Sequence, residues 1–101
     1  MYKRQVEHPS LEREVAILRR RLPGITGQLA GQVAAAVGRL RTADLLKPPG
    51  VAESIDWAMA LQALGCRELD PQSAAMTLGA VLKYREDTDR VLAGGLSSLV
   101  A

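Results

Sequence analysis

The sequence contains no phenylalanine, and aromatic residues of all kinds make up only 3% of its 101 residues, although 48% are hydrophobic. A core of this composition has to be built from Leu, Val, Ile, Ala and Met side chains, which is typical of helices packed on helices. Apolar residues recur at helical spacing along most of the chain. The composition and spacing therefore predict an all-α fold, a small bundle of four helices.

Cysteine, histidine and long apolar runs are equally scarce. The single cysteine, Cys66, excludes an internal disulfide and favours a reducing compartment. The single histidine, His8, excludes a zinc site built from several histidines. No run of about 18 apolar residues could span a membrane, and the polar start lacks the apolar segment of a signal peptide. We therefore expect a cytoplasmic protein without a membrane partner.

Sequence motifs for catalysis are missing as well. The chain has neither the GxxxxGK[ST] phosphate loop nor the GxGxxG dinucleotide motif. Glu53 and Asp56 are three residues apart and could form an acid pair, but carboxylates in a first helical turn usually stabilise the helix dipole. Trp57 is interpreted as a core anchor and Cys66 as a structural residue. We expect no catalytic residue in this chain.

The first five residues differ in character from those that follow. A GTG start codon followed by TAT AAG AGA CAG would encode residues 1–5, and this string matches the end of a transposon adapter used in sequencing libraries. We therefore expect residues 1–5 to be a non-native leader and the natural chain to be truncated at Val6. Without Lys3 and Arg4, 11 basic residues balance 11 acidic ones, so the pI near 9.0 does not indicate a nucleic acid partner.

Helix signals place the first two helices. Pro9 suits the first position of a helix that ends at Pro23-Gly24, with Ser10 in its first turn. Thr26 is a suitable N-cap for a second helix, which should end near Arg41. The apolar stripes are Leu11, Val15, Leu18 and Leu22 in the first helix, and Leu29, Val33, Ala36, Val37 and Leu40 in the second.

A third helix follows the Pro48-Pro49 pair and is apolar on most of its faces, so we expect other helices to pack around it. It should end at Gly65 in the left-handed conformation. Asp70 and Pro71 are the N-cap and first residue expected of a fourth helix. That helix is predicted to run to Asp87 or Leu92 on a stripe of Ala75, Leu78, Val81 or Leu82, and Arg85. Residues 93–101 should form a frayed tail.

One long run of residues resembles a known family. Residues 41–46 and the following KPPGVAESIDWA at 47–58 resemble the C-terminal region of MoxR-type AAA+ ATPases. The most similar branch is linked with maturation of carbon monoxide dehydrogenase. The same resemblance extends to residues 6–9, 14–18, 60–61, 64–65, 69–71 and 77–87, and thus covers roughly residues 6–87.

The resemblance implies that residues 6–92 are the helical lid of an ATP-driven ring machine. The phosphate loop, the Mg-binding acid and the arginine finger would lie in a nucleotide-binding core upstream of Val6. It further implies ATP with Mg as cofactor, a homo-oligomeric ring, and chaperone-like maturation of a metalloenzyme or von Willebrand A-type partner. The lid alone would have no activity.

The resemblance also indicates a nucleotide site. It places Ile17 near the adenine and the start of the third helix, residues 49–54, toward the phosphates, where backbone N–H groups and the helix dipole favour an anion. The arginine that usually senses the γ-phosphate is absent there, so Lys47 could substitute for it, another subunit could supply it, or backbone groups could suffice. The candidate cofactor-binding residues are Ile17, Lys47, Gly50, Val51, Ala52 and Glu53.

Other functions remain open on the sequence. A stand-alone helical interaction domain could bind a partner through the small residues of the second helix. A helix-turn-helix nucleic acid binder is disfavoured by the balanced charge and the Ala-rich second helix. Arg19, Arg20 and Arg21 are interpreted as a solvated helix end, with contact to a neighbouring subunit or a phosphate as the alternative. The small residues of the second helix are Gly27, Ala30, Gly31, Ala34, Ala35 and Gly38.

Overall fold

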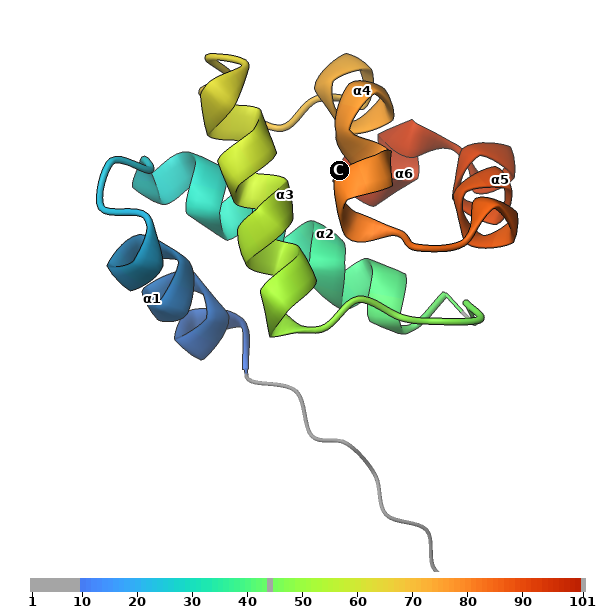
Figure 1. The fold of residues 1–101 in the computed structure, drawn as a ribbon, viewed down its shortest axis with the longest axis horizontal. Coiled ribbons are helices and arrows are strands. Elements are labelled where there is room, and N and C mark those ends of the chain that lie inside the picture. The colour runs from blue at the N-terminus through green and yellow to red at the C-terminus, as the bar shows by residue number, and fades with distance from the viewer. Residues whose placement is uncertain (1–9, 44, 101) are drawn as a thin grey trace, which may run out of the picture.

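The computed structural model describes residues 10–43 and 45–100, and every regular element in these two ranges is a helix (Figure 1). Five helices of ten or more residues precede a short sixth one. The all-α prediction is confirmed for the described residues, but the prediction of four helices is wrong. The helices are α1 (Leu11–Arg21), α2 (Gly27–Arg41), α3 (Val51–Ala63), α4 (Pro71–Val81), α5 (Arg85–Gly94) and α6 (Leu96–Val100).

The first two helices begin at polar caps. Thr26 Oγ1 accepts a hydrogen bond of 3.0 Å from Leu29 N–H, which confirms the predicted N-cap of α2. Ser10 was predicted in the first turn of α1 but is its N-cap, accepting from Arg13 N–H at 3.2 Å. The prediction for Pro9 lies outside the described residues, as do those for His8 and for residues 1–5. The stripe predicted for α2 is buried along its whole length.

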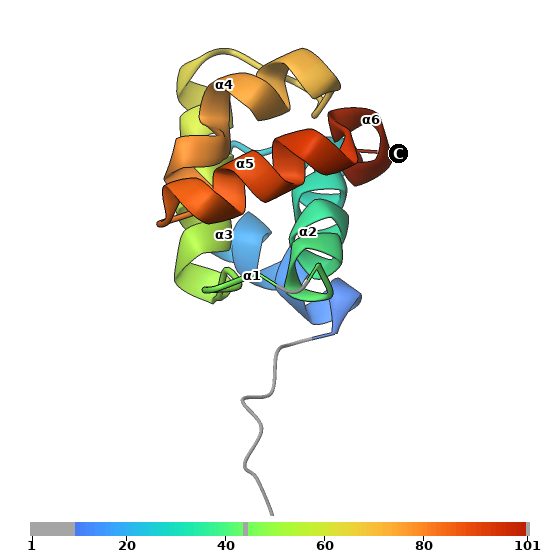
Figure 2. The ribbon, with the colours of Figure 1, turned by 90° about the vertical axis from the view of Figure 1, so that its right-hand side faces the viewer.

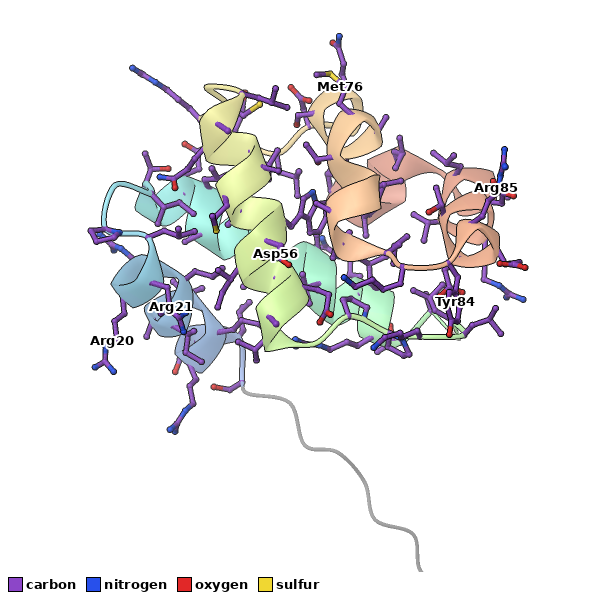
Figure 3. All side chains as sticks on the ribbon, in the orientation of Figure 1. Arg20, Arg21, Asp56, Met76, Tyr84 and Arg85 are labelled. Carbon is purple, nitrogen blue, oxygen red and sulfur yellow. The ribbon has the colours of Figure 1, made fainter. Side chains whose placement is uncertain are left out.

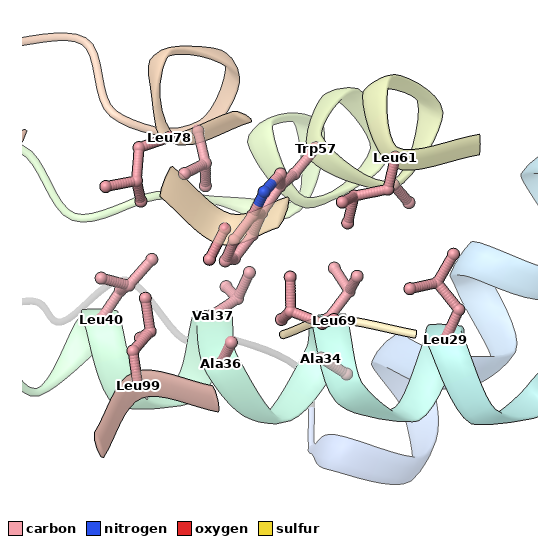
Figure 4. Packing of buried hydrophobic residues seen from close by; sticks show 14 of the residues in the cluster. Leu29, Ala34, Ala36, Val37, Leu40, Trp57, Leu61, Leu69, Leu78 and Leu99 are labelled. Carbon is pink, nitrogen blue, oxygen red and sulfur yellow. The ribbon is translucent and has the colours of Figure 1, made fainter. Parts of the chain in front are cut away.

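Trp57 of α3 is fully buried at the centre of the core, as predicted (Figure 4). Its ring lies between Leu78 of α4 and the stripe of α2. Trp57 Nε1 donates to Thr77 Oγ1 at 2.6 Å, and the Thr77 hydroxyl donates to the Ser73 carbonyl oxygen at 2.7 Å. The polar tip of the indole is therefore satisfied inside the core, where an unpaired N–H would cost about 1–3 kcal/mol.

The expectation that α3 is surrounded by other helices is wrong. Met59 and Leu64 are about half exposed, at 51% and 53%. The buried positions of α3 are Ser54, Trp57, Ala58 and Leu61, which lie on one side of the helix. The alanine and the serine on this side have small side chains, so neighbouring helices can approach closely. Helices α1, α2 and α4 cover this side, and the opposite side faces solvent.

The end of α3 and the start of α4 follow the predicted signals. Gly65 has φ +77°, Gly65 N–H donates to the Gln62 carbonyl at 2.9 Å, and Cys66 N–H donates to the Leu61 carbonyl at 3.0 Å. These two bonds form a Schellman motif around a left-handed residue. Asp70 caps α4 by accepting from Ser73 N–H at 2.7 Å, and Pro71 is its first residue.

The fourth helix is shorter than predicted. Helix α4 ends at Val81, because Leu82 turns to an extended conformation and buries its side chain. A separate α5 then carries the residues from Arg85 onward, which were predicted to continue α4. Of the described residues in the predicted tail, Leu96–Val100 form α6, whose Leu99 is only 6% exposed. Helix α1 and the α5–α6 pair lie at opposite ends of the molecule, and Figure 2 looks onto α5.

Candidate functional site

Residues 46–50, directly before α3, contain the proline pair and are called the corner here. Pro49 is buried, and its carbonyl oxygen accepts a hydrogen bond of 2.9 Å from Arg41 Nε at the end of α2. Gly50 N–H donates to Glu53 Oε1 at 2.9 Å. The corner is thus attached both to the helix that precedes it and to the helix that follows it.

A buried ion pair between α1 and α2 supports the corner. Glu14 of α1 is 2% exposed, and its carboxylate receives two parallel hydrogen bonds from Arg41, Nη1 to Oε1 at 2.8 Å and Nη2 to Oε2 at 2.9 Å. The Ser54 hydroxyl of α3 donates to Glu14 Oε2 at 2.6 Å. One carboxylate therefore joins three helices, and the two-pronged geometry makes this a strong form of charged hydrogen bond. Glu14, Arg41 and Ser54 are called the Glu14 cluster.

A second buried acid holds the corner from the opposite end of the molecule. Asp87, in the first turn of α5, is 1% exposed. Its two carboxylate oxygens accept from Leu46 N–H at 2.7 Å and from Lys47 N–H at 3.0 Å. These bonds satisfy the backbone of a segment that belongs to no helix. The corner is therefore held by side chains from α2, α3 and α5.

Glu53 places a negative charge at the start of α3. The hydrogen bond from Gly50 N–H holds the pKa of Glu53 below its ordinary value of 4.5, against the opposing effect of burial, and the charges of Lys47 and Lys83 lower it further. Glu53 is therefore ionised at neutral pH. Its carboxylate stabilises the helix dipole, as the sequence predicted, and stands where an external anion would approach.

The structure brings together some of the predicted site residues. Gly50, Val51, Ala52 and Glu53 form the start of α3, and the charge of Lys47 acts on Glu53. Lys47 and Ala52 are exposed. Ile17 instead lines a hollow whose described lining residues all belong to α1, together with Arg13, Ala16 and Arg20. None of the other candidate residues lines that hollow.

The remaining residues singled out by sequence lie apart from the corner or face solvent. Asp56 is exposed on the outer side of α3, and Arg20 and Arg21 extend from the outer side of α1 (Figure 3). Cys66 is a free, half-buried thiol after α3. Within residues 10–43 and 45–100 there is no group of three or more His, Cys, Asp or Glu side chains that could hold a metal ion.

Sequence reasoning missed Glu14, Arg41 and Asp87. A signal was present for the first two, because Glu14 interrupts the apolar stripe of α1 and Arg41 lies four residues after Val37 on the stripe of α2. Opposite charges on two apolar stripes indicate a buried pair. Asp87 could not be found in this way, because it was predicted to lie at or near the end of one long helix.

Comparison with known proteins adds no relative. No family model, no curated protein and no solved structure matches the chain. Among the described residues, no helix has both the length and the apolar character needed to cross a bilayer. Because none of the comparisons found a match, the resemblance to MoxR-type lids depends on the sequence segments quoted above.

Proposed function

We propose that this chain is the helical lid of a MoxR-type AAA+ ATPase and that the corner is its nucleotide-facing element. The observation that carries the proposal is the fixation of residues 46–54 by buried acids and an arginine from α1, α2 and α5. An element held in this way keeps its backbone groups in one orientation, as a site for a charged ligand requires.

The corner would act through backbone amides and one lysine. The first turn of α3 presents the N–H groups of Val51, Ala52 and Glu53, which a helix leaves without partners inside the helix itself. Lys47 is exposed beside them and would approach the γ-phosphate in place of the missing arginine. The ionised Glu53 opposes a triphosphate, so its carboxylate would turn away toward Lys47 and Lys83, or face the Mg ion, when nucleotide binds. Ile17 would contact the adenine from α1.

The proposed setting is a cytoplasmic, homo-oligomeric ring. The phosphate loop and most Mg contacts would come from a core domain encoded upstream of Val6, and the lid would close on ATP bound there. Closure would drive chaperone-like maturation of a partner, a metalloenzyme or a von Willebrand A-type protein. The lid itself contributes no catalytic side chain in this proposal.

The reading frame upstream of Val6 tests the proposal first. A GxxxxGK[ST] motif encoded there in frame supports it, whereas an in-frame stop codon directly before the genomic codon of Val6 would contradict it. In the complete protein, Lys47→Ala should lower ATP turnover about tenfold, since such cations stabilise the charge that develops on the transferred phosphate. Arg67→Ala removes an exposed cation beyond the other end of α3 and should leave turnover unchanged.

The second candidate is a stand-alone interaction domain that uses α2. Ala30 and Ala34 are buried in this chain, but a side chain added at Gly31 or Gly38 would meet no atom within 4 Å. Close packing within the chain therefore does not explain these two glycines, each of which costs roughly 0.5–1 kcal/mol relative to alanine. A partner helix approaching Gly31, Ala35 and Gly38 would explain them.

Substitution at those glycines separates the two candidates. If the chain is an interaction domain, Gly31→Leu and Gly38→Leu should abolish binding of a partner helix. If it is the lid, both variants should leave ATP turnover of the complete protein unchanged. If both variants bind every partner as the natural chain does, the interaction through α2 is excluded.

A further inference from the structure

The outer side of α3 presents large apolar side chains to solvent. Met59 and Leu64 are about half exposed, and Met76 of the adjacent α4 is 60% exposed. Leu64 and Met76 line one hollow of about 230 Å³, so the apolar surface continues from α3 onto α4. Helix α4 itself contains no charged residue. Exposed apolar side chains that adjoin one another in this way mark an interaction surface.

Large and small side chains are mixed on this side of α3. Because successive helical residues are about 100° apart, positions 56, 60 and 63 follow the middle of the outer side, with positions 59 and 64 on its two edges. Position 60 is half-buried and the other four are exposed. Another helix could therefore approach closely along the middle. These five residues are called the α3 face: Asp56, Met59, Ala60, Ala63 and Leu64 (Figure 3).

The α3 face is complementary in shape to a second copy of itself that runs antiparallel. A two-fold axis that passes midway between Ala60 and Ala63 places each large side chain of one copy against an alanine of the other. Met59 then lies against Ala63 along one edge, and Leu64 lies against Ala60 along the other. A surface that matches itself in this way is the requirement for a symmetric dimer.

The charges beside the face match in the same arrangement. Asp56 and Arg67 are equally far along the chain from the two-fold axis, one before it and one after it. Arg67 is exposed just beyond the C-terminal end of α3, and Asp56 is exposed on its outer side. The antiparallel arrangement therefore brings Asp56 of each copy to the level of Arg67 of the other. Two such pairs of opposite charge favour this register over others.

We propose that two copies of this chain associate through the α3 face in a weak, symmetric dimer. One helix face from each copy buries less than the roughly 1,200 Å² of a stable interface, so we expect a Kd on the order of 0.1 mM. The dimer is then unoccupied at the low protein concentrations of a turnover assay. The α3 face does not include the corner, and this proposal does not depend on the lid proposal.

Sedimentation equilibrium of the full chain tests for the dimer. The average mass should rise from that of one chain toward that of two as the concentration passes through the expected Kd. Backbone amide signals of Met59, Ala60 and Ala63 should shift over the same range. A mass of one chain at all concentrations up to about ten times that Kd, or assemblies larger than two chains, would overturn the proposal.

Exchanging the two charges tests the register. Asp56→Arg and Arg67→Asp each place like charges opposite one another twice in the dimer, and each should weaken self-association at least about fivefold. An equimolar mixture of the two variants restores both pairs, because one variant supplies two cations at these positions and the other supplies two anions. The mixture should associate about as tightly as the natural chain. A mixture that associates no better than either variant alone would contradict this register.

A matched pair of alanine variants locates the contact. Ala63→Arg should weaken self-association at least about tenfold, because its side chain occupies the space in which Met59 of the other copy lies. Ala93→Arg makes the same change at an exposed position of α5, away from the α3 face, and should leave association unchanged. Association of Ala63→Arg as tight as that of the natural chain would exclude the α3 face.

Discussion

The two ends of α3 are fixed by different physical means. Its N-terminal end is held by charged side chains that come from other helices: Arg41 on Pro49, and Glu14 on Ser54. Its C-terminal end is closed by two backbone hydrogen bonds around Gly65. The first arrangement needs residues far apart in sequence, whereas the second is complete within one helical turn.

This difference affects both energy and specificity. Burying Glu14 and Arg41 removes two charges from water, and their mutual hydrogen bonds offset that cost only while both partners are present. The Gly65 turn requires only one residue that accepts a positive φ. We therefore expect the N-terminal end to respond strongly to the loss of single side chains and the C-terminal end to respond modestly.

The largest effect should come from Glu14→Ala. The substitution leaves Arg41 buried without its carboxylate and should lower the free energy of unfolding by about 3–5 kcal/mol, measured by urea denaturation. Glu12→Ala, on the exposed side of the same helix, is the matched control and should change stability by less than about 0.5 kcal/mol. Replacing Glu14 and Arg41 together by leucine and methionine should recover most of the loss. A loss below about 1 kcal/mol for the single variant would remove the contrast between the two ends.

Asp87→Asn should have the next largest effect. The amide retains one acceptor oxygen, so either Leu46 or Lys47 loses its hydrogen-bond acceptor, at a cost of about 1–3 kcal/mol. Hydrogen exchange of these two amides should accelerate more than exchange in α2. Asp89→Asn alters an exposed acid on the same helix and should leave both amides protected. Equal protection in the two variants would show that α5 does not hold the corner.

At the other end of α3, Gly65→Ala should cost about 1–2 kcal/mol, because an alanine is strained at φ +77°. The same change at Gly79, inside α4, should instead stabilise the chain by roughly 0.5–1 kcal/mol. Thermal unfolding of the two variants gives this difference directly. If both alanines stabilise the chain, the left-handed turn is not what closes α3.

The smallest effect concerns acid stability. The pKa of Glu53 is lower in the folded chain than its ordinary value of 4.5, so the unfolded state takes up this proton first as the pH falls. The stabilisation is therefore complete above about pH 4.5 and is lost as the pH falls through the folded pKa. Glu53→Gln should remove this part of the pH dependence, at a cost below about 1 kcal/mol at pH 7.

Asp70 titrates in the same region and serves as the internal reference for that experiment. The hydrogen bonds from Ser73 N–H and from the Ser73 hydroxyl hold the pKa of Asp70 below its ordinary value of 3.8. Glu53→Gln leaves these bonds intact, so the acid-dependent loss of stability due to Asp70 should persist. Identical pH profiles for Glu53→Gln and the natural chain would show that Glu53 does not cap α3.

Local signals were sufficient to predict the elements whose ends are fixed by adjacent residues. Thr26 and Asp70 each cap the helix that follows them, and Gly65 ends α3, because their partners lie within five residues. The break after Val81 was missed, because Leu82 leaves the helix in order to bury its side chain and no Gly or Pro marks the change.

The corner shows the same limit in the candidate site. The start of a helix directly after the Pro48-Pro49 pair was predicted. The side chains that hold the corner were not predicted, because they are distant in sequence from their partners. Glu14 lies 27 residues from Arg41, and Asp87 lies 40 and 41 residues from the two amides that donate hydrogen bonds to it. Pairings over such distances are determined by packing, which a local pattern does not contain.

The large sequence separation between Asp87 and its two backbone partners has a consequence for synthesis of the chain on the ribosome. Helices α1, α2 and α3 all emerge before α5, and the partners within the Glu14 cluster are available to one another as soon as Ser54 has left the exit tunnel. The amides of Leu46 and Lys47 must wait until Asp87 emerges, 41 and 40 residues after them. During that interval these two amides donate hydrogen bonds to water. The Glu14 cluster of the nascent chain is then complete, while the corner still lacks its contact with α5.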